Sequence, residues 1–375
     1  MAERLLCGVN HPALELWKDF SLDRLERDLS RAASLGAAVV RLLLPWEVFQ
    51  PERERVPEQR LRELELLLDT AERLSLRVLP LLFARPPGGA QQIPEWLVEV
   101  FSGQTRKPRD FYQERENVRA QQLLIQVLAG AFCRHEALAG WDLGREISRL
   151  APPSDPETAR SWLLRLLEAL KKVDERHPAT FTFSQGELEE DRGLRPSRMA
   201  AELDFISVQA LPAEAAWARA PDDAEAPAFL AHLVRALTGK EVLVSELGLP
   251  TGDETGSGAP PGLIRSEEEG ARFYESALEA VRRTGAMGAL AWCLDDFPAS
   301  YSAMPHERFY GLFRAEGSPK PAVESLSRFA RGQPERVEAA GPPRIDEGVF
   351  YRDPSNQLRA EYDKFLRPHS EPATD

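Results

Sequence analysis

The stretch "SLDRLERDLSRAASLGAAVVRLLLP", residues 21 to 45, contains a helix, a turn and a buried strand in direct succession. Leu22, Leu25 and Leu29 recur at helical spacing, and Gly36 stands where a left-handed helix C-cap belongs. The run that follows is almost entirely apolar, as expected of a strand that is covered on both faces. This order predicts a parallel sheet whose strands are joined by helical crossovers.

The same alternation recurs along the chain. Eight strand and helix units in a chain of 375 residues predict a closed (β/α)8 TIM barrel. An open Rossmann-like sheet is the alternative, but no strand is followed by G-x-G-x-x-G and there is no P-loop. The predicted strands cover residues 4–10, 37–45, 76–83, 138–144, 179–184, 204–209, 241–248 and 288–294.

Two of the intervening helices have a predicted start. Ser154 to Glu157 and Ser266 to Glu269 both have the Ser-x-x-Glu spacing of a capping box. The fifth crossover, near "RPSRMAAEL", is expected to be the shortest.

Two long segments and a tail depart from a minimal barrel. Residues 84–115 and the Gly- and Pro-rich residues 251–262 follow the third and seventh strands, so we expect both on the C-terminal face, where such barrels have their active sites. The barrel is predicted to span residues 1–332. Residues 333–375 are predicted to form a C-terminal extension, a strap that packs in part before a frayed end.

The composition argues against several kinds of partner. A net charge of -13 offers no positive surface for nucleic acid. No run of about 20 apolar residues is present to cross a membrane, and the N-terminus lacks the pattern of a signal peptide. The chain as written is therefore expected to be cytoplasmic, unless a leader has been removed.

No cofactor or metal is expected from the sequence motifs. The 6 histidines show no HExxH or paired metal spacing, and no G-x-S-x-G elbow indicates a serine hydrolase. Cys7, Cys133 and Cys293 are widely spaced and are expected to be reduced residues in apolar segments.

Two glutamates stand at the ends of predicted strands. Glu146 follows the fourth strand and Glu246 ends the seventh, so they should face each other across the barrel mouth. A retaining glycosidase needs two carboxyl groups about 5 Å apart, one protonated and one ionised. An ionised Glu246 would raise the pKa of Glu146, whereas Arg145 would lower it if its guanidinium comes close.

The sequence resembles clan A glycoside hydrolases, in particular family five of the cellulase and endo-mannanase type. The resemblance covers roughly the first 330 residues. It implies Glu146 as acid/base, Glu246 as nucleophile, Arg41 as a support for the nucleophile and Trp292 as a platform under the sugar. The matching segments are "GVN", "VVRLLLPWEVFQP", "IPEWL", the segment that ends in "LAGWDLGRE", "VLVSELGLPT", "GALAWCLDDF" and "ERFYGLFRAEGSPKPA".

Two positions depart from this family pattern. Arg145 stands where the family usually has an asparagine that contacts the substrate 2-hydroxyl. The sixth strand ends in Gln209, Ala210 and Leu211 in place of His-x-Tyr, whose hydroxyl contacts the nucleophile. Each lost hydrogen bond is worth roughly 2 to 4 kcal/mol in the transition state, so both together would slow hydrolysis by several orders of magnitude.

Several other candidates have an equally simple structural explanation. Asn10 could contact sugar hydroxyls or form a turn before Pro12. Trp46 could contact substrate or pack in the core or rim. Arg41, inside an apolar run, could form a structural salt bridge to a barrel carboxylate.

Three functions remain open from the sequence. The first is a retaining β-glycosidase for a carbohydrate substrate. The second is a weak or inactive relative that binds carbohydrate or a protein partner. The third is a glycosidase for anionic sugars, which Arg145 would bind.

An Arg145 side chain lying across the cleft would argue against retaining catalysis, and one turned aside would leave it open. The sugar, the linkage and the oligomeric state are not determined.

Overall fold

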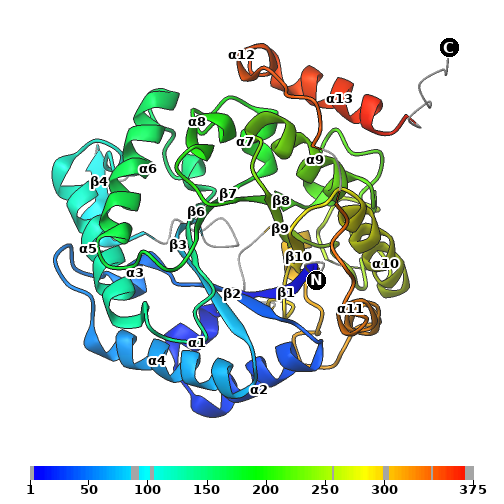
Figure 1. Ribbon diagram of the computed structural model, residues 1–375. Helices are drawn as coiled ribbons and strands as arrows, with labels where there is room; N and C mark the ends of the chain where they lie inside the picture. Colours follow the sequence, from blue (N-terminus) through cyan, green and yellow to red (C-terminus); the bar gives the residue numbers. More distant parts are fainter. Residues whose placement is uncertain are drawn as a thin grey trace.

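Eight parallel strands close into a barrel with the helices outside it (Figure 1). The structure is a computed structural model that describes residues 4–85, 93–101, 105–255, 257–298, 304–338 and 341–367. Around the barrel the strands follow the order β1, β10, β9, β8, β7, β6, β3, β2, and every neighbouring pair is parallel. The predicted TIM barrel is therefore confirmed.

The barrel strands coincide with the eight predicted apolar runs. They are β1 (Leu6–His11), β2 (Val39–Leu43), β3 (Arg77–Ala84), β6 (Trp141–Arg145), β7 (Ala179–Phe183), β8 (Ile206–Ala210), β9 (Val242–Leu247) and β10 (Gly288–Ala291). The α-helices are α1 (Leu14–Lys18), α2 (Leu22–Ser34), α3 (Trp46–Phe49), α4 (Glu58–Arg73), α5 (Arg115–Phe132), α6 (Pro156–Lys171), α7 (Gln185–Glu189), α8 (Pro196–Ala200), α9 (Ala226–Thr238), α10 (Glu267–Arg283), α11 (Ala322–Arg331), α12 (Glu347–Phe350) and α13 (Pro354–Phe365). Short 3-10 helices are η1 (Glu95–Leu97), η2 (Ile147–Arg149), η3 (Pro212–Glu214) and η4 (Pro305–Phe309).

Local predictions were confirmed with one exception. Gly36 has the left-handed φ of 78° that its position after α2 requires. Ser266 and Glu269 form the predicted capping box of α10. The predicted box at Ser154 is wrong, because Asp155 is the N-cap of α6 and accepts the N–H groups of the first turn itself. A carboxylate directly before the helix thus caps it in place of the serine.

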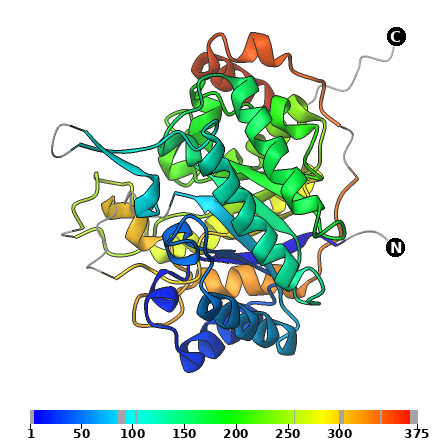
Figure 2. The ribbon, with the colours of Figure 1, turned by 90° about the vertical axis from the view of Figure 1, so that its left-hand side faces the viewer.

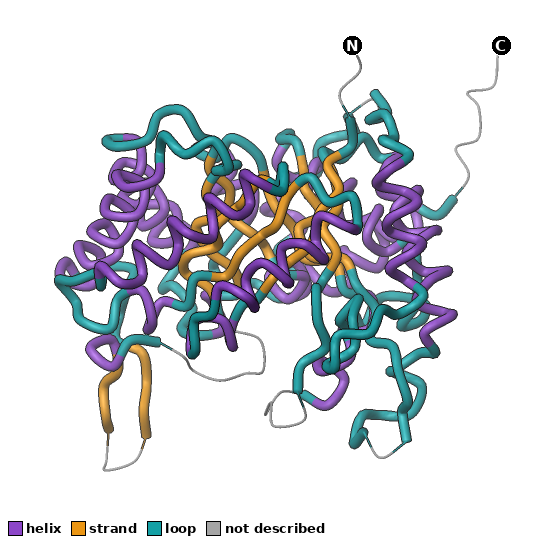
Figure 3. The backbone as a smooth tube through the Cα atoms, turned by 90° about the horizontal axis from the view of Figure 1, so that it is seen from below, coloured by secondary structure: helices purple, strands orange, loops and turns teal. Residues whose placement is uncertain are grey.

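A feature that the apolar pattern did not reveal is a hairpin in the segment after β3. It consists of the antiparallel strands β4 (Val98–Phe101) and β5 (Thr105–Pro108). Figures 2 and 3 show it standing out from the same end of the barrel as the loops that follow β9. This end is the C-terminal face of the sheet.

The barrel interior divides into an apolar and a polar half. At the N-terminal end of the strands the interior is filled by an apolar cluster of Val39, Leu79, Phe205, Leu243 and Leu290. Toward the C-terminal end, buried charged and polar side chains take over. This division places the chemistry at one end of the barrel and the packing at the other.

The described part of the C-terminal extension lies against the barrel. α13 packs against α7 and α9 at the edge of the molecule (Figure 1). Phe350, Leu358 and Tyr362 are buried there. Among the described residues, no helix is both long and apolar enough to cross a membrane.

Glu47 in α3 provides a test of stability against pH. Burial raises the pKa of this carboxyl to about 7, and its Oε2 has no hydrogen-bond partner among the described residues. A raised carboxyl pKa means that the native state holds its proton longer than the unfolded chain does. The resulting contribution to stability is complete below pH 4.5 and is lost as the pH rises through 7.

Replacing Glu47 with glutamine should therefore stabilise the protein at pH 8 by up to about 3 kcal/mol and have little effect near pH 4. Thermal unfolding of Glu47→Gln at both pH values measures this, with the exposed Glu54→Gln as control. An equal shift at both pH values would contradict the assignment to titration.

Candidate active site

Buried polar side chains from six of the strands meet at the C-terminal end of the barrel. Asn10 and Arg41 are register partners on β1 and β2, and Gln209 and Glu246 are partners on β8 and β9. β6 contributes Asp142 and Arg145, and β7 contributes Thr182. The predicted convergence of the fourth- and seventh-strand ends thus brings Glu246 into a larger network.

Arg41 is the centre of this network and is 1 % exposed. Its Nε donates to Asp142 Oδ2 at 2.8 Å, and its Nη1 donates to Glu246 Oε1 at 2.7 Å. Nη1 also reaches Asn10 Oδ1 at 2.9 Å, and Nη2 reaches Thr182 Oγ1 at 2.9 Å. All three nitrogens are therefore engaged, which a buried guanidinium requires. Arg41 thus pairs at once with the barrel carboxylate Asp142 and with Glu246, so both contacts that its two sequence interpretations call for are present.

Glu246 is fully buried and held on both carboxylate oxygens. Oε1 accepts from Arg41, and Oε2 accepts from Gln209 Nε2 at 3.0 Å. Gln209 thus supplies a donor to Glu246 from the strand that lacks the expected His-x-Tyr. A third group, Nε of Arg145, lies 2.6 Å from Oε1 as an ion pair. These contacts fix the orientation of the carboxylate.

Arg145 lies across the cleft. In addition to its ion pair with Glu246, its Nη1 lies 3.1 Å from Glu146 Oε2. Its guanidinium carbon stands 4.9 Å from the ring centroid of Trp292. One side chain therefore bridges the two glutamates and covers the tryptophan face that the resemblance assigns to a sugar.

Glu146 is 4 % exposed and surrounded by arginines. Beyond Arg145, Arg149 Nε lies 3.1 Å from its Oε1 and Arg85 Nη1 lies 3.6 Å from its Oε2. Burial alone would raise the pKa of Glu146, but the charges of Arg145, Arg149 and Arg85 outweigh burial and lower it. Of the two opposing influences expected on this pKa, the lowering by Arg145 prevails, because its guanidinium comes close to Glu146. In this arrangement Glu146 is an ionised carboxylate, not a proton donor.

The Glu146 backbone lies in the left-handed region, with φ 52° and ψ 23°. This conformation costs a residue with a side chain roughly 1 to 2 kcal/mol. Strained residues of this kind persist only where surrounding contacts hold them, and they cluster at functional sites.

Arg145 leaves little space in the centre of the mouth. Two hollows lie beside it, of about 10 Å³ and about 20 Å³, and Arg85, Arg145 and Trp292 line both. Each has room for about one water molecule, far less than a sugar ring. Hollows of about 640 Å³ and about 610 Å³ adjoin them, the first beside His11 and the second beside Arg149.

The remaining sequence candidates differ in their position. Asn10 lines the mouth of the barrel. Its Nδ2 donates to the main-chain oxygens of Ser245 and Ala291 at 2.7 and 3.0 Å, so its amide hydrogen-bonds to other strands of the barrel. Trp46 does not join the site. It is 2 % exposed and packs edge-on against Phe83, with its Nε1 bonded to Gln50. Its expected substrate contact has no support in this position.

Several site residues were not identified from the sequence. Asp142 and Thr182 alternate with apolar neighbours inside predicted strands, and that alternation toward the barrel axis was the available signal. Arg85 and Arg149 gave no signal, because Arg85 lies in the loop after β3 and Arg149 ends the short η2. Glu214 on η3 lines the same hollow as Arg145 and accepts a hydrogen bond from the Tyr310 hydroxyl at 3.1 Å.

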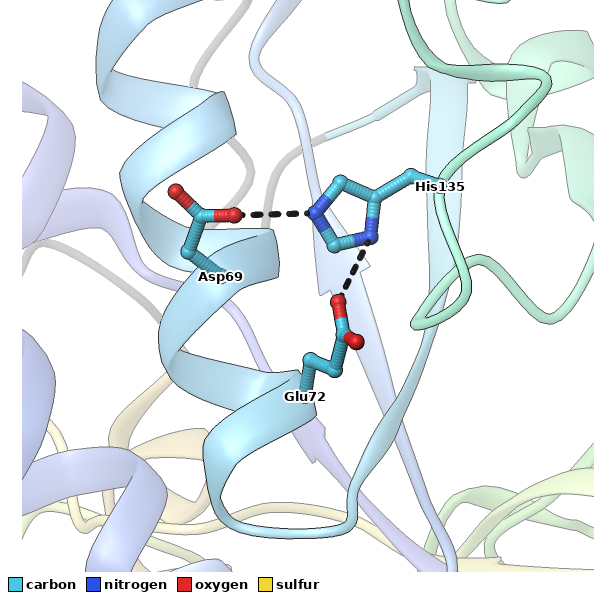
Figure 4. A group of neighbouring side chains, drawn as sticks. All are labelled: Asp69, Glu72 and His135. Atoms are coloured by element: carbon cyan, nitrogen blue, oxygen red, sulfur yellow. Dashed lines mark hydrogen bonds and ion pairs between the residues drawn. The ribbon is translucent and has the colours of Figure 1, made fainter.

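One histidine lies between carboxylates away from this mouth, beside α4 (Figure 4). His135 Nε2 is 3.2 Å from Asp69 Oδ1, and its Nδ1 is 3.8 Å from Glu72 Oε2. The two carboxylates thus approach different ring nitrogens. Nδ1 also accepts the N–H of Ala137 at 3.1 Å. One ligand atom of each of the three side chains lies within 4.8 Å of the others, and the contacts that they make here are those of a hydrogen-bonded imidazole.

Solved structures with a similar fold include glycoside hydrolases. The GH5_18 protein of Streptomyces cattleya in complex with GlcNAc aligns with a TM-score of 0.80 at 22% identity, over 97% of this chain and 91% of that one. An exo-β-1,4-mannosidase from Opitutaceae bacterium strain TAV5 aligns with 0.71 at 23%, over 88% and 60%. The endo-β-1,4-mannanase of Thermotoga petrophila aligns with 0.64 at 16%, over 88% and 77%.

No protein-family model and no curated protein matches the sequence. The structural likeness therefore establishes the fold, and it agrees with the resemblance to family five drawn from the sequence motifs.

Proposed function

We propose that this protein is a glycosidase-type protein for β-linked saccharides, with Glu246 as nucleophile and Glu146 as acid/base, in which Arg145 restrains catalysis. The observation that carries the proposal is the setting of Glu246. It is a fully buried carboxylate aimed at the barrel mouth and oriented by Arg41 and Gln209. A carboxylate that served only in a structural salt bridge with Arg41 would not need a second cation, Arg145, at the same oxygen.

The reaction would proceed by double displacement. Glu246 attacks the anomeric carbon and displaces the leaving oxygen, to which Glu146 gives its proton. Glu146 then takes a proton from water while the water oxygen bonds to the anomeric carbon and displaces Glu246, which releases the sugar. Arg41 and Gln209 would keep the nucleophile in place through both steps. Arg145 opposes each role, because it pairs with Glu246 and keeps Glu146 ionised. Turnover requires this side chain to leave the cleft.

β-Mannosides are the first substrates to test. Structures with the same fold include GH5_18 variants in complex with Manβ1-4GlcNAc, an exo-mannosidase and an endo-mannanase. We infer the same substrate class for this chain from that likeness together with the two glutamates.

The experiment is hydrolysis of 4-nitrophenyl β-mannoside and Manβ1-4GlcNAc by the wild-type chain and by Glu246→Gln. We expect slow wild-type turnover with retention of the anomeric configuration, which proton NMR of the product detects. The rate of hydrolysis should be at least about 100-fold lower in the variant. Glu268→Gln, an exposed carboxylate on α10, is the control. Hydrolysis that is unchanged in Glu246→Gln would refute the assignment.

A second function is favoured by the same bridge. Because Arg145 occupies both carboxylates, the chain can be a relative that binds saccharide without cleaving it. Calorimetry that detects Manβ1-4GlcNAc binding, with no product over days, would support this reading. Robust turnover would exclude it.

Specificity for anionic sugars has less support from the geometry. The guanidinium of Arg145 is already matched by two protein carboxylates, so a sugar carboxylate would have to displace one of them. A comparison of neutral and uronate-containing substrates tests it, and no preference for the uronates would remove it.

A further inference from the structure

We propose that Tyr351 in the C-terminal extension is a positioning residue for Glu146, acting through Glu187 and Ser148. The inference rests on the proposed role of Glu146. It assigns a task to the extension, which lies outside the minimal barrel and whose role the sequence motifs leave open.

The first link joins the Glu146 loop to α7. Ser148 lies two residues after Glu146, on η2, and is 4 % exposed. Its hydroxyl donates to Glu187 Oε1 at 2.5 Å. The other carboxylate oxygen of Glu187 accepts the main-chain N–H and the hydroxyl of Ser184, at 2.6 and 2.8 Å. Glu187 therefore ties the segment after β6 to the segment after β7.

The second link joins α7 to the extension. The hydroxyl of Tyr351 donates to the main-chain oxygen of Glu187 at 2.9 Å. Its ring is 7 % exposed and lies under the guanidinium of Arg195, 4.9 Å from the ring centroid. Glu347, one turn earlier, pairs with Arg198 at 3.3 Å. These contacts fix the extension on α7, which carries Glu187, and on the start of α8.

These contacts end at the segment that holds the backbone of Glu146. Glu146 holds a left-handed backbone conformation that is strained for a residue with a side chain. Such a conformation persists when its surroundings determine it. The bond from Ser148 to the buried Glu187 supplies this constraint. Tyr351 in turn keeps Glu187 in place.

The extension offers a matched control. Tyr362 on α13 is also a buried tyrosine, and its hydroxyl donates to Asp223 Oδ2 at 2.7 Å. It thus braces the segment after β8, and among the described residues it makes no hydrogen bond with Ser148 or Glu187. Tyr351→Phe and Tyr362→Phe each remove one phenol hydroxyl from the same extension and keep the ring.

Hydrogen exchange by mass spectrometry on the full-length variants tests the link without requiring catalysis. Tyr351→Phe should raise exchange at least about tenfold in residues 184–190 and 146–150, since local opening follows loss of the bracing bonds. Tyr362→Phe should leave residues 146–150 unchanged. Ser148→Ala should raise exchange in 146–150 but not in 347–351.

A kinetic readout separates positioning from general stability. In an Arg145→Asn background, Tyr351→Phe should lower kcat for 4-nitrophenyl β-mannoside at least about fivefold with KM unchanged, whereas Tyr362→Phe should change neither. If the background has no activity, the proposed function fails while the exchange result still decides the link. Unaltered exchange at 146–150 in Tyr351→Phe, or an equal change in Tyr362→Phe, would overturn the inference.

Discussion

Arg145→Asn is expected to raise the rate of β-mannoside hydrolysis by at least about 100-fold, the usual worth of one well-placed transition-state contact. The change frees Glu246 from its ion pair and uncovers the face of Trp292. It also removes the positive charge that does most to keep the pKa of Glu146 low against the effect of burial. An asparagine amide is in addition a neutral donor that can reach a substrate hydroxyl.

The pH dependence of the variant checks the cause. Loss of the Arg145 charge lets burial raise the pKa of Glu146, so Glu146 keeps its proton to higher pH. The basic limb of the plot of kcat/KM against pH should then lie at higher pH than in the wild type. Arg145→Lys keeps a charge at this position and should show neither the rate increase nor the shift. Equal rates in Arg145→Asn and wild type would mean that Arg145 does not restrain catalysis.

Arg41→Met is expected to have the largest effect on stability, a loss of about 3 to 5 kcal/mol. The variant leaves Asp142 and Glu246 as buried carboxylates without their shared cation, and it also removes a donor to Thr182. Differential scanning calorimetry should record a midpoint lower by roughly 5 to 10 °C.

A surface arginine provides the comparison. Arg73 pairs with Glu26 at 3.0 Å, but its side chain is 64% exposed and its partner's 53%. Arg73→Met should therefore cost no more than about 1 kcal/mol. A similar loss in both variants would show that Arg41 is not the centre of a buried network.

The sequence predicted the strands and their order because each strand is an apolar run between two segments whose apolar residues recur at helical spacing. Both patterns are local properties of the sequence. It also predicted that Glu146 and Glu246 stand at the same end of the barrel, since parallel strands place their C-terminal ends together. The hairpin β4–β5 escaped prediction because its strands are short and lie outside the barrel, and none of their described side chains is buried. The cap at Asp155 was missed because serine and aspartate compete locally for the same N–H groups.

The sequence by itself determined the barrel, the two carboxylates at its mouth and the unusual presence of Arg145 beside one of them. Only the tertiary structure decided where the Arg145 side chain lies. Its direction depends on the balance between Glu246 on β9, Glu146 and the ring of Trp292, three partners supplied by distant parts of the chain. The same holds for the pKa of Glu146, because its arginines come from three separate positions and their charges act through space.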